Sequence, residues 1–286
     1  MLIDTLWKQG LRLLPKTLLS RLLGKFATIT GPKALVNAQI NGFSRIFHID
    51  LTEAKKPPAA FSSLQEFFTR ELKEGVRPID SDEDALVAPC DGFWGQSGEV
   101  TNGLMLQIKG KSYRTASLLG SEEHAAQFEG GSYATFYLSP RDYHRFHTPM
   151  RCAVQEAVYF PGYLWPVNAM AVRNVDQLFC VNERVATILR VGESTQGTLA
   201  MVAVGACVVG KIRMFFDETL ASPHGCHIDR RLYTRAAPKL EKGDQMGCFE
   251  FGSTIVLIAA KETAKIECQP VSTVLRIGTR IGKVLC

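Results

Sequence analysis

EFGSTIVLIAA, residues 250–260, places glycine, serine and threonine directly before an unbroken apolar run. A short continuous run of this kind is typical of a β-strand that is buried on both faces. Gly252 can supply the turn geometry at the start of such a strand, and the hydroxyls of Ser253 and Thr254 can bond to nearby backbone. The pattern therefore predicts a buried strand that starts at Gly252-Ser253-Thr254.

Further short apolar runs, separated by Gly, Pro and Asp, fill the chain from Val87 onward. They include GSYATFYLS, AVQEAVYFPG, ERVATILRV and LAMVAVGACVVGKIRMFF. Many short strands with turn signals between them are typical of antiparallel sheets. With an ordinary apolar content of 46%, the sequence predicts an α+β protein, whose β-rich domain, mainly an antiparallel sheet or sandwich, covers residues 57–286.

The N-terminal residues 1–26 are rich in leucine and have apolar side chains at helical spacing, and Pro15 should divide them into two short helices. Residues 1–30 hold five basic residues and one acid, and so carry four of the net five positive charges. This composition predicts an amphipathic helical segment, within a region of residues 1–56, that lies at a membrane surface. A core or oligomerisation helix and a transit peptide are the alternatives.

Beyond this segment the chain is nearly neutral, which argues against a nucleic-acid partner. The eight cysteines show no CxxC pair, so we expect reduced thiols rather than a disulfide framework. The uncharged, mainly apolar stretch of residues 197–210 is shorter than the ~20 residues of a membrane-spanning helix. A polar connector at residues 51–60 leads to Ser63 and Glu66, which have the spacing of a capping box.

LSPRDYHRFHTP, residues 138–149, contains the most informative cluster of titratable side chains. Ser139, Pro140 and Asp142 fit the start of a helix, which would place His144 and His147 on one face. Two such imidazoles can act as proton donor and base near neutral pH. They can equally form half of a metal site, completed by His224 and His227 of SPHGCH, or have no function.

APCDG, residues 88–92, places Asp91 at a strand junction. Asp-Gly is an ordinary turn dipeptide, so a structural role is sufficient to explain it. The functional alternative is a carboxylate that orients one of the histidines, as the acid does in a serine, histidine and aspartate triad.

These motifs together resemble the bacterial phosphatidylserine decarboxylase proenzymes. The resemblance rests on APCDG, YLSPRDYHRFHTP, PGYLWPVN, NERV, VGACVVG and KGDQMGCFEFGST, which occur in the family's order between about Val87 and Thr254. Phe251 is a departure, because many members have leucine in an LGST signature. This apolar replacement keeps the Gly252–Ser253 bond.

The resemblance implies that the Ser253 hydroxyl attacks the Gly252 carbonyl carbon, with His147 as the base and Asp91 orienting it. Cleavage would give a large subunit, residues 1–252, and a small one, residues 253–286, with a covalent pyruvoyl cofactor made from Ser253. The pyruvoyl ketone would form a Schiff base with the substrate amine and accept the electron pair left by carbon dioxide. His144 would then donate the proton, assisted by His147.

The implied reaction converts phosphatidylserine to phosphatidylethanolamine at an anionic membrane surface. The implied enzyme is peripheral, on the cytoplasmic face of the bacterial inner membrane, with its own cleaved subunits and a second copy of the chain as protein partners. No resident metal is expected. The alternatives are a pyruvoyl decarboxylase of another serine lipid or amino acid, a zinc hydrolase using His144, His147, His224 and His227, and a non-catalytic domain related to lipoyl carriers.

Overall fold

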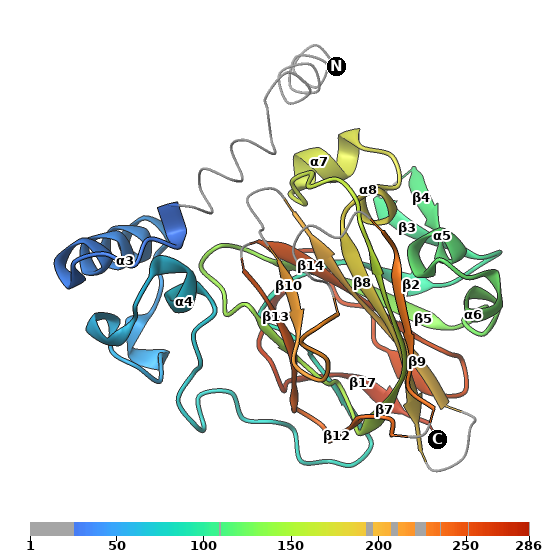
Figure 1. The fold of residues 1–286 in the computed structure, drawn as a ribbon. Helices are drawn as coiled ribbons and strands as arrows, with labels where there is room; N and C mark the ends of the chain where they lie inside the picture. The colour runs from blue at the N-terminus through green and yellow to red at the C-terminus, as the bar shows by residue number, and fades with distance from the viewer. Residues whose placement is uncertain are drawn as a thin grey trace.

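A computed structural model describes residues 26–285 except positions 109, 193–196, 207–210, 221–226, 235 and 251 (Figure 1). In these residues short helices accompany sheets whose named strands all pair antiparallel, which confirms the predicted α+β class. The helices are α3 (Lys33–Phe47), α4 (Leu64–Phe68), α5 (Thr115–Leu119), α6 (Glu122–Ala126), α7 (Ala169–Asn174) and α8 (Leu178–Val181), with 3-10 turns at Leu51–Glu53 and Pro58–Ala60. The strands are β1 (Ala85–Val87), β2 (Gly92–Glu99), β3 (Leu104–Ile108), β4 (Lys111–Arg114), β5 (Ser132–Leu138), β6 (Arg145–His147), β7 (Cys152–Phe160), β8 (Arg184–Val191), β9 (Gly197–Gly205), β10 (Ile212–Met214), β11 (Asp229–Leu232), β12 (Lys239–Leu240), β13 (Gln245–Phe249), β14 (Ser253–Ala259), β15 (Ala264–Ile266), β16 (Val274–Leu275) and β17 (Arg280–Val284).

The largest sheet has the order β11-β7-β8-β9-β14-β5-β2-β16, and β12 also pairs with β7. Strand β14 lies between β9 and β5 and begins at Ser253, as the sequence predicts. Ser253 is opposite Gly205 on one side and Leu138 on the other. The backbone of Ser253 is therefore fixed by two neighbouring strands.

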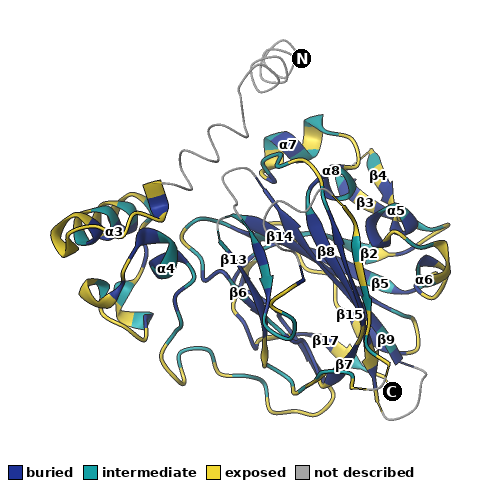
Figure 2. Cartoon of the chain, in the orientation of Figure 1, coloured by how far each residue is buried: buried dark blue, intermediate teal, exposed yellow. Residues whose placement is uncertain are grey.

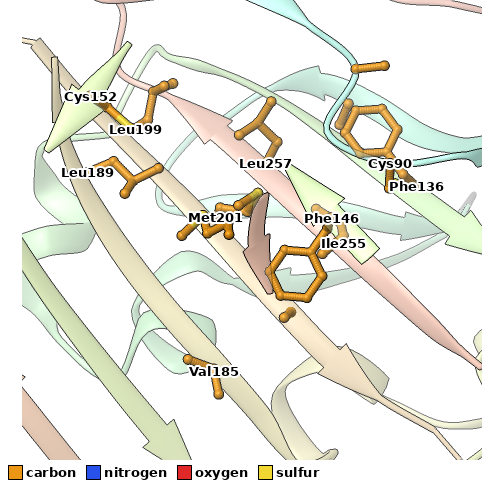
Figure 3. Packing of buried hydrophobic residues seen from close by; sticks show 14 of the residues in the cluster. Cys90, Phe136, Phe146, Cys152, Val185, Leu189, Leu199, Met201, Ile255 and Leu257 are labelled. Atoms are coloured by element: carbon orange, nitrogen blue, oxygen red, sulfur yellow. The ribbon is translucent and has the colours of Figure 1, made fainter. Parts of the chain in front are cut away.

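The two faces of β14 are covered by different layers, which explains its continuous apolar sequence. Ile255 and Leu257 pack in a core shared with the small sheets β10-β13-β6 and β1-β17-β15 (Figure 3). Val256 and Ile258 pack in a second core with residues of α5, α8 and the β3–β4 hairpin. Figure 2 shows β8 and β14 buried along most of their length.

Helices α3 and α4 lie beside the sheets at one side of the molecule (Figure 1). Val36, Ile40 and Phe67 belong to a separate cluster of buried residues there. The predicted capping of α4 is confirmed, because the Ser63 hydroxyl accepts a hydrogen bond of 3.1 Å from the Glu66 amide. The amphipathic helices predicted for residues 1–26 lie outside the described residues except for Phe26. Among the residues described, no helix is long and apolar enough to cross a membrane.

The prediction of a helix that starts at Ser139 is wrong, because the chain forms a turn and then a strand there. Ser139 and Asp142 do form a local turn, in which the Asp142 carboxylate accepts hydrogen bonds of 2.7 Å from the amide and hydroxyl of Ser139. The chain then enters β6, which pairs with β13, and Phe146 packs against Phe249 in the core. Sheet pairing and burial of Phe146 outweigh the local helix signal. His144 and His147 therefore do not share a helix face.

The described cysteines support the expectation of reduced thiols. Cys90, Cys152, Cys180, Cys248 and Cys268 are all unpaired.

Candidate active site

Ser253 is a fully buried serine whose hydroxyl has no hydrogen-bond partner among the described residues. The preceding Gly252 is half-buried, and a Cβ atom built on it would meet nothing within 4 Å. A hydroxyl that is buried and unpaired loses the hydrogen bonds that water would give it. Ser253 therefore has a free hydroxyl beside a peptide bond whose approach is open.

Gly252 and Ser253 line a cavity of about 430 Å³ between helices α3 and α4 and the start of β14. The cavity wall is largely aromatic and apolar. Its other lining residues are Phe26, Ala27, Phe43, Phe47, Leu64, Phe68, Tyr137, Pro140, Pro166, Val167, Asn168 and Ala206. A cavity of this size and composition suits part of an apolar ligand.

His144 contacts the wall of this cavity, because its ring packs at a tilt of 42° against the ring of Phe68, with centroids 4.0 Å apart. Its Nδ1 lies 2.8 Å from the Asp142 carbonyl oxygen, which can only accept a hydrogen bond, so Nδ1 carries the proton. The other ring nitrogen, Nε2, is buried and has no partner in the described chain. Burial, with a smaller contribution from the charge of Arg70, lowers the pKa of His144 to about 3. His144 is therefore neutral at neutral pH, with a free acceptor at Nε2.

His147 is held by two different contacts at the end of β6. Its Nδ1 donates to the Gly243 carbonyl oxygen at 2.7 Å, and its Nε2 accepts from the Tyr143 hydroxyl at 3.3 Å. Burial lowers the pKa of His147, while the bond to Gly243 and the charge of Asp91 act in the opposite direction. His147 thus has its acceptor nitrogen at Nε2, where the Tyr143 hydroxyl occupies it.

Asp91 is completely buried at the start of β2, where its carboxylate binds two arginines. Arg77 donates at 2.6 to 3.0 Å, Arg276 at 3.1 Å, and the Ile277 amide at 2.9 Å. Gly92 is required beside it, because its φ is +151° and a Cβ atom would lie 2.3 Å from the Tyr137 carbonyl oxygen. Asp91 influences His147 through its charge, while its carboxylate oxygens are held by the arginines.

The structure brings some of the predicted residues together and leaves others apart. Gly252 and Ser253 share the cavity with Phe68, against which His144 packs. The His147 amide donates to the Pro89 carbonyl oxygen at 2.7 Å, close to Asp91 in the chain. Neither histidine is hydrogen-bonded to the Ser253 hydroxyl. The catalytic roles of these residues stay predictions.

Sequence reasoning missed the arginines of this region. Arg70, Arg77 and Arg276 come from segments far apart in the chain and carry no motif. The stretch FFTRELKEGVRPID, residues 67–80, has three basic and three acidic residues, so its charge gave no signal either.

The zinc alternative receives no support from the described residues, which contain no group of three or more His, Cys, Asp or Glu able to hold a metal ion. His227 is exposed, while the ring of His144 is buried against Phe68. His224 lies outside the described residues.

Comparison with known proteins identifies the family. The family model of phosphatidylserine decarboxylase matches residues 64–283. A phosphatidylserine decarboxylase proenzyme of Shewanella baltica is 44% identical over 255 residues, which cover 87% of this chain and 86% of the relative. A proenzyme of the same name from Anaeromyxobacter is 40% identical over 282 residues, or 98% of each chain. These matches confirm that the protein is an enzyme and a decarboxylase, and the chain belongs to the phosphatidylserine decarboxylase family.

Proposed function

We propose that the protein converts phosphatidylserine to phosphatidylethanolamine with a pyruvoyl group that it makes from its own Ser253. The observation that carries the proposal is the Ser253 hydroxyl, which is buried without a partner beside Gly252 in an apolar cavity. The family match and the proenzyme names of the relatives agree with a chain that processes itself.

In the self-cleavage, the Ser253 oxygen attacks the Gly252 carbonyl carbon, and the proton of the hydroxyl passes to His147. The bond between the Gly252 carbonyl and the Ser253 nitrogen breaks as the nitrogen takes this proton from His147, which leaves an ester and a free amine. Loss of the Ser253 Cα proton then breaks the Cβ–O bond and releases the Gly252 carboxylate. Water replaces the nitrogen of the resulting dehydroalanine, and ammonia leaves. The open side of Gly252 favours the attack, because no side chain stands in the way.

The site fits this cofactor, because Ser253, whose hydroxyl is free, is the first residue of β14. This strand is paired on both sides, which holds the residue in place. Once formed, the pyruvoyl group supplies a carbonyl that binds the substrate amine and takes up the electron pair released with carbon dioxide. The chain supplies the proton transfers. His144 has a free Nε2, and its low pKa makes the neutral ring a weak base and the protonated ring a strong acid, so we assign to it the donation of a proton to the carbon that loses carbon dioxide.

The N-terminal side of the cavity supports action at a membrane surface. Phe26, Ile29, Leu35 and Ile46 are large apolar side chains left exposed in and before α3. Phe26 also lines the cavity, so acyl chains that leave it would meet this apolar surface. We propose that residues 1–56 attach a peripheral enzyme to the membrane and that residues 57–286 catalyse the reaction. The basic N-terminus favours the anionic cytoplasmic leaflet.

Intact-mass measurement of the purified chain tests the proposal. We expect the wild type to separate into fragments 1–252 and 253–286, and Ser253→Ala to remain whole and inactive. Ser44→Ala is a matched control, because the Ser44 hydroxyl is also buried without a partner but lies in α3. A whole wild-type chain that still releases carbon dioxide from phosphatidylserine would exclude the pyruvoyl mechanism.

A further inference from the structure

Arg70 is a buried arginine that follows α4, and two of its three guanidinium nitrogens have no hydrogen-bond acceptor in the described residues. Only 4% of the residue is exposed, and its Nε and Nη1 atoms have no acceptor anywhere in the described residues. Its guanidinium group lies over the ring of Phe67, 5.0 Å from the centroid. An arginine keeps its charge in proteins, so the cation at this position is both desolvated and unpaired.

Other ionised groups near Arg70 have close partners. Glu71 binds Lys55 at 2.7 Å and Arg145 at 3.2 Å. Asp142 accepts from Ser139 and lies 3.9 Å from Arg141. The lack of a partner is therefore particular to Arg70 and is not a general feature of this part of the molecule.

The nearest carboxylates are held by other arginines. Asp91 and Glu53 both attract Arg70. Arg77 binds both of these carboxylates, and Arg276 binds Asp91. Arg70 has no ion pair of its own with either carboxylate, and a buried cation without a direct partner is costly unless an anion is also bound.

Arg70 is close to the cavity that contains Ser253. It is two residues after Phe68, which lines the cavity and packs against His144. The charge of Arg70 also acts on His144 directly, since it contributes to the lowered pKa of that ring. Arg70 does not itself line the cavity, so a ligand group must extend past Phe68 and His144 to meet the guanidinium group.

We propose that Arg70 binds the phosphodiester of the phospholipid substrate. This inference rests on the proposed function, because it takes the occupant of the cavity to be a serine phospholipid. The phosphodiester is a monoanion that can pair with this buried cation, and its oxygens can accept hydrogen bonds from the free Nε and Nη1.

The carboxylate of the substrate is a poorer partner for Arg70. Its charge is lost as carbon dioxide forms, so a cation bound to it would stabilise the substrate more than the transition state and slow the reaction. The phosphate keeps its charge throughout. Arg70 bound to phosphate would hold substrate and transition state equally, and would lower KM without lowering kcat.

Equilibrium binding of short-chain lipids to the Ser253→Ala chain tests this assignment without turnover. The probes are dihexanoyl phosphatidylserine and dihexanoyl phosphatidylethanolamine, of which only the first has a carboxylate. We expect Arg70→Gln to weaken both by the same factor of about ten to one hundred, the usual worth of a charge-assisted hydrogen bond. Arg114→Gln removes an exposed arginine of β4 and should leave both affinities unchanged.

Loss of phosphatidylserine affinity alone would assign Arg70 to the carboxylate, and unchanged affinity for both lipids would exclude Arg70 from binding. Both results overturn the proposal. If Arg70→Gln does not fold, a second binding measurement on the chain that keeps Arg70 tests the proposal. A methylated, uncharged phosphotriester of dihexanoyl phosphatidylethanolamine should then bind at least tenfold more weakly than the diester, and equal binding overturns the proposal.

These outcomes are separate from those of the proposed function. An uncleaved and inactive wild-type chain would refute self-processing, while binding of phosphatidylethanolamine through Arg70 could still be measured. Conversely, a cleaved and active Arg70→Gln enzyme with unchanged KM would refute the role of Arg70 alone.

Discussion

His144 combines complete burial with a free ring nitrogen, and this combination has a consequence for stability. Its pKa in the folded chain is about 3, against 6.5 for an unperturbed imidazole. The folded state therefore binds fewer protons between these values than the unfolded state does. The contribution of neutral His144 to the free energy of unfolding is therefore complete above about pH 6.5, and it is lost as the pH falls towards 3.

We expect the free energy of unfolding to fall by about 2 kcal/mol more between pH 6.5 and pH 5 in the Ser253→Ala chain than in the same chain with His144→Gln. Urea titrations at the two pH values measure the difference. Glutamine cannot titrate, and every other ionisable group is shared by the two chains. Equal pH dependence in both would mean that the pKa of His144 is the same in the folded and unfolded chains.

Single residues were predicted from the sequence only where a motif marked them. Ser253, Asp91, His144 and His147 all lie in distinctive segments, and all four are buried or nearly so. Their contacts could not be predicted in the same way. The partners of Asp91 are Arg77 and Arg276, which are separated from it by 14 and 185 positions and come together only in the folded chain.

At the scale of elements, strand β14 was predictable and strand β6 was not. The apolar run of β14 has one interpretation, because both of its faces meet a core. The segment that contains β6 has good local helix-start chemistry at Ser139 and Asp142. Its strand depends on pairing with β13, about 100 residues later, and no local pattern reports such a partner.

Phe146 is the residue that should hold β6 in place, because it is fully buried and its ring packs against that of Phe249, with centroids 5.0 Å apart. We expect Phe146→Ala to lower the free energy of unfolding of the Ser253→Ala chain by about 3 to 5 kcal/mol, the usual cost of removing a buried phenylalanine. Denaturant unfolding measures this cost. Ile46→Ala, which truncates an apolar side chain that is 71% exposed, should change the value by less than about 0.5 kcal/mol. Equal effects of the two substitutions would mean that β6 contributes little to the core.

At the scale of the whole molecule, the proposed attachment surface is at one side. Figure 1 places α3 and α4 outside the sheets, and the cavity lies between these helices and the start of β14. The exposed apolar residues of this side can enter a bilayer, while the basic residues of the N-terminus can attract anionic lipid. Membrane binding should therefore need both apolar and electrostatic contacts.

Substitution of two N-terminal basic residues separates the electrostatic part. We expect Lys8→Glu with Arg12→Glu, which lie outside the described residues, to weaken binding to phosphatidylglycerol-containing vesicles by at least about 30-fold. This corresponds to about 1 kcal/mol for each basic residue removed near the surface. Binding of the unaltered enzyme should also fall as salt rises, because exposed charges are screened. Vesicle sedimentation measures both effects.

The control for this experiment is the same charge change at the other end of the molecule. Lys261 and Lys265 are exposed after β14 and in β15, and Figure 2 shows β15 away from α3. Lys261→Glu with Lys265→Glu alters net charge as much as the N-terminal pair does, so any loss caused by net charge alone would appear in both. If the two double variants bind alike, the N-terminal segment is not the attachment site, and its apolar face must instead pack within the protein or against a second copy of the chain.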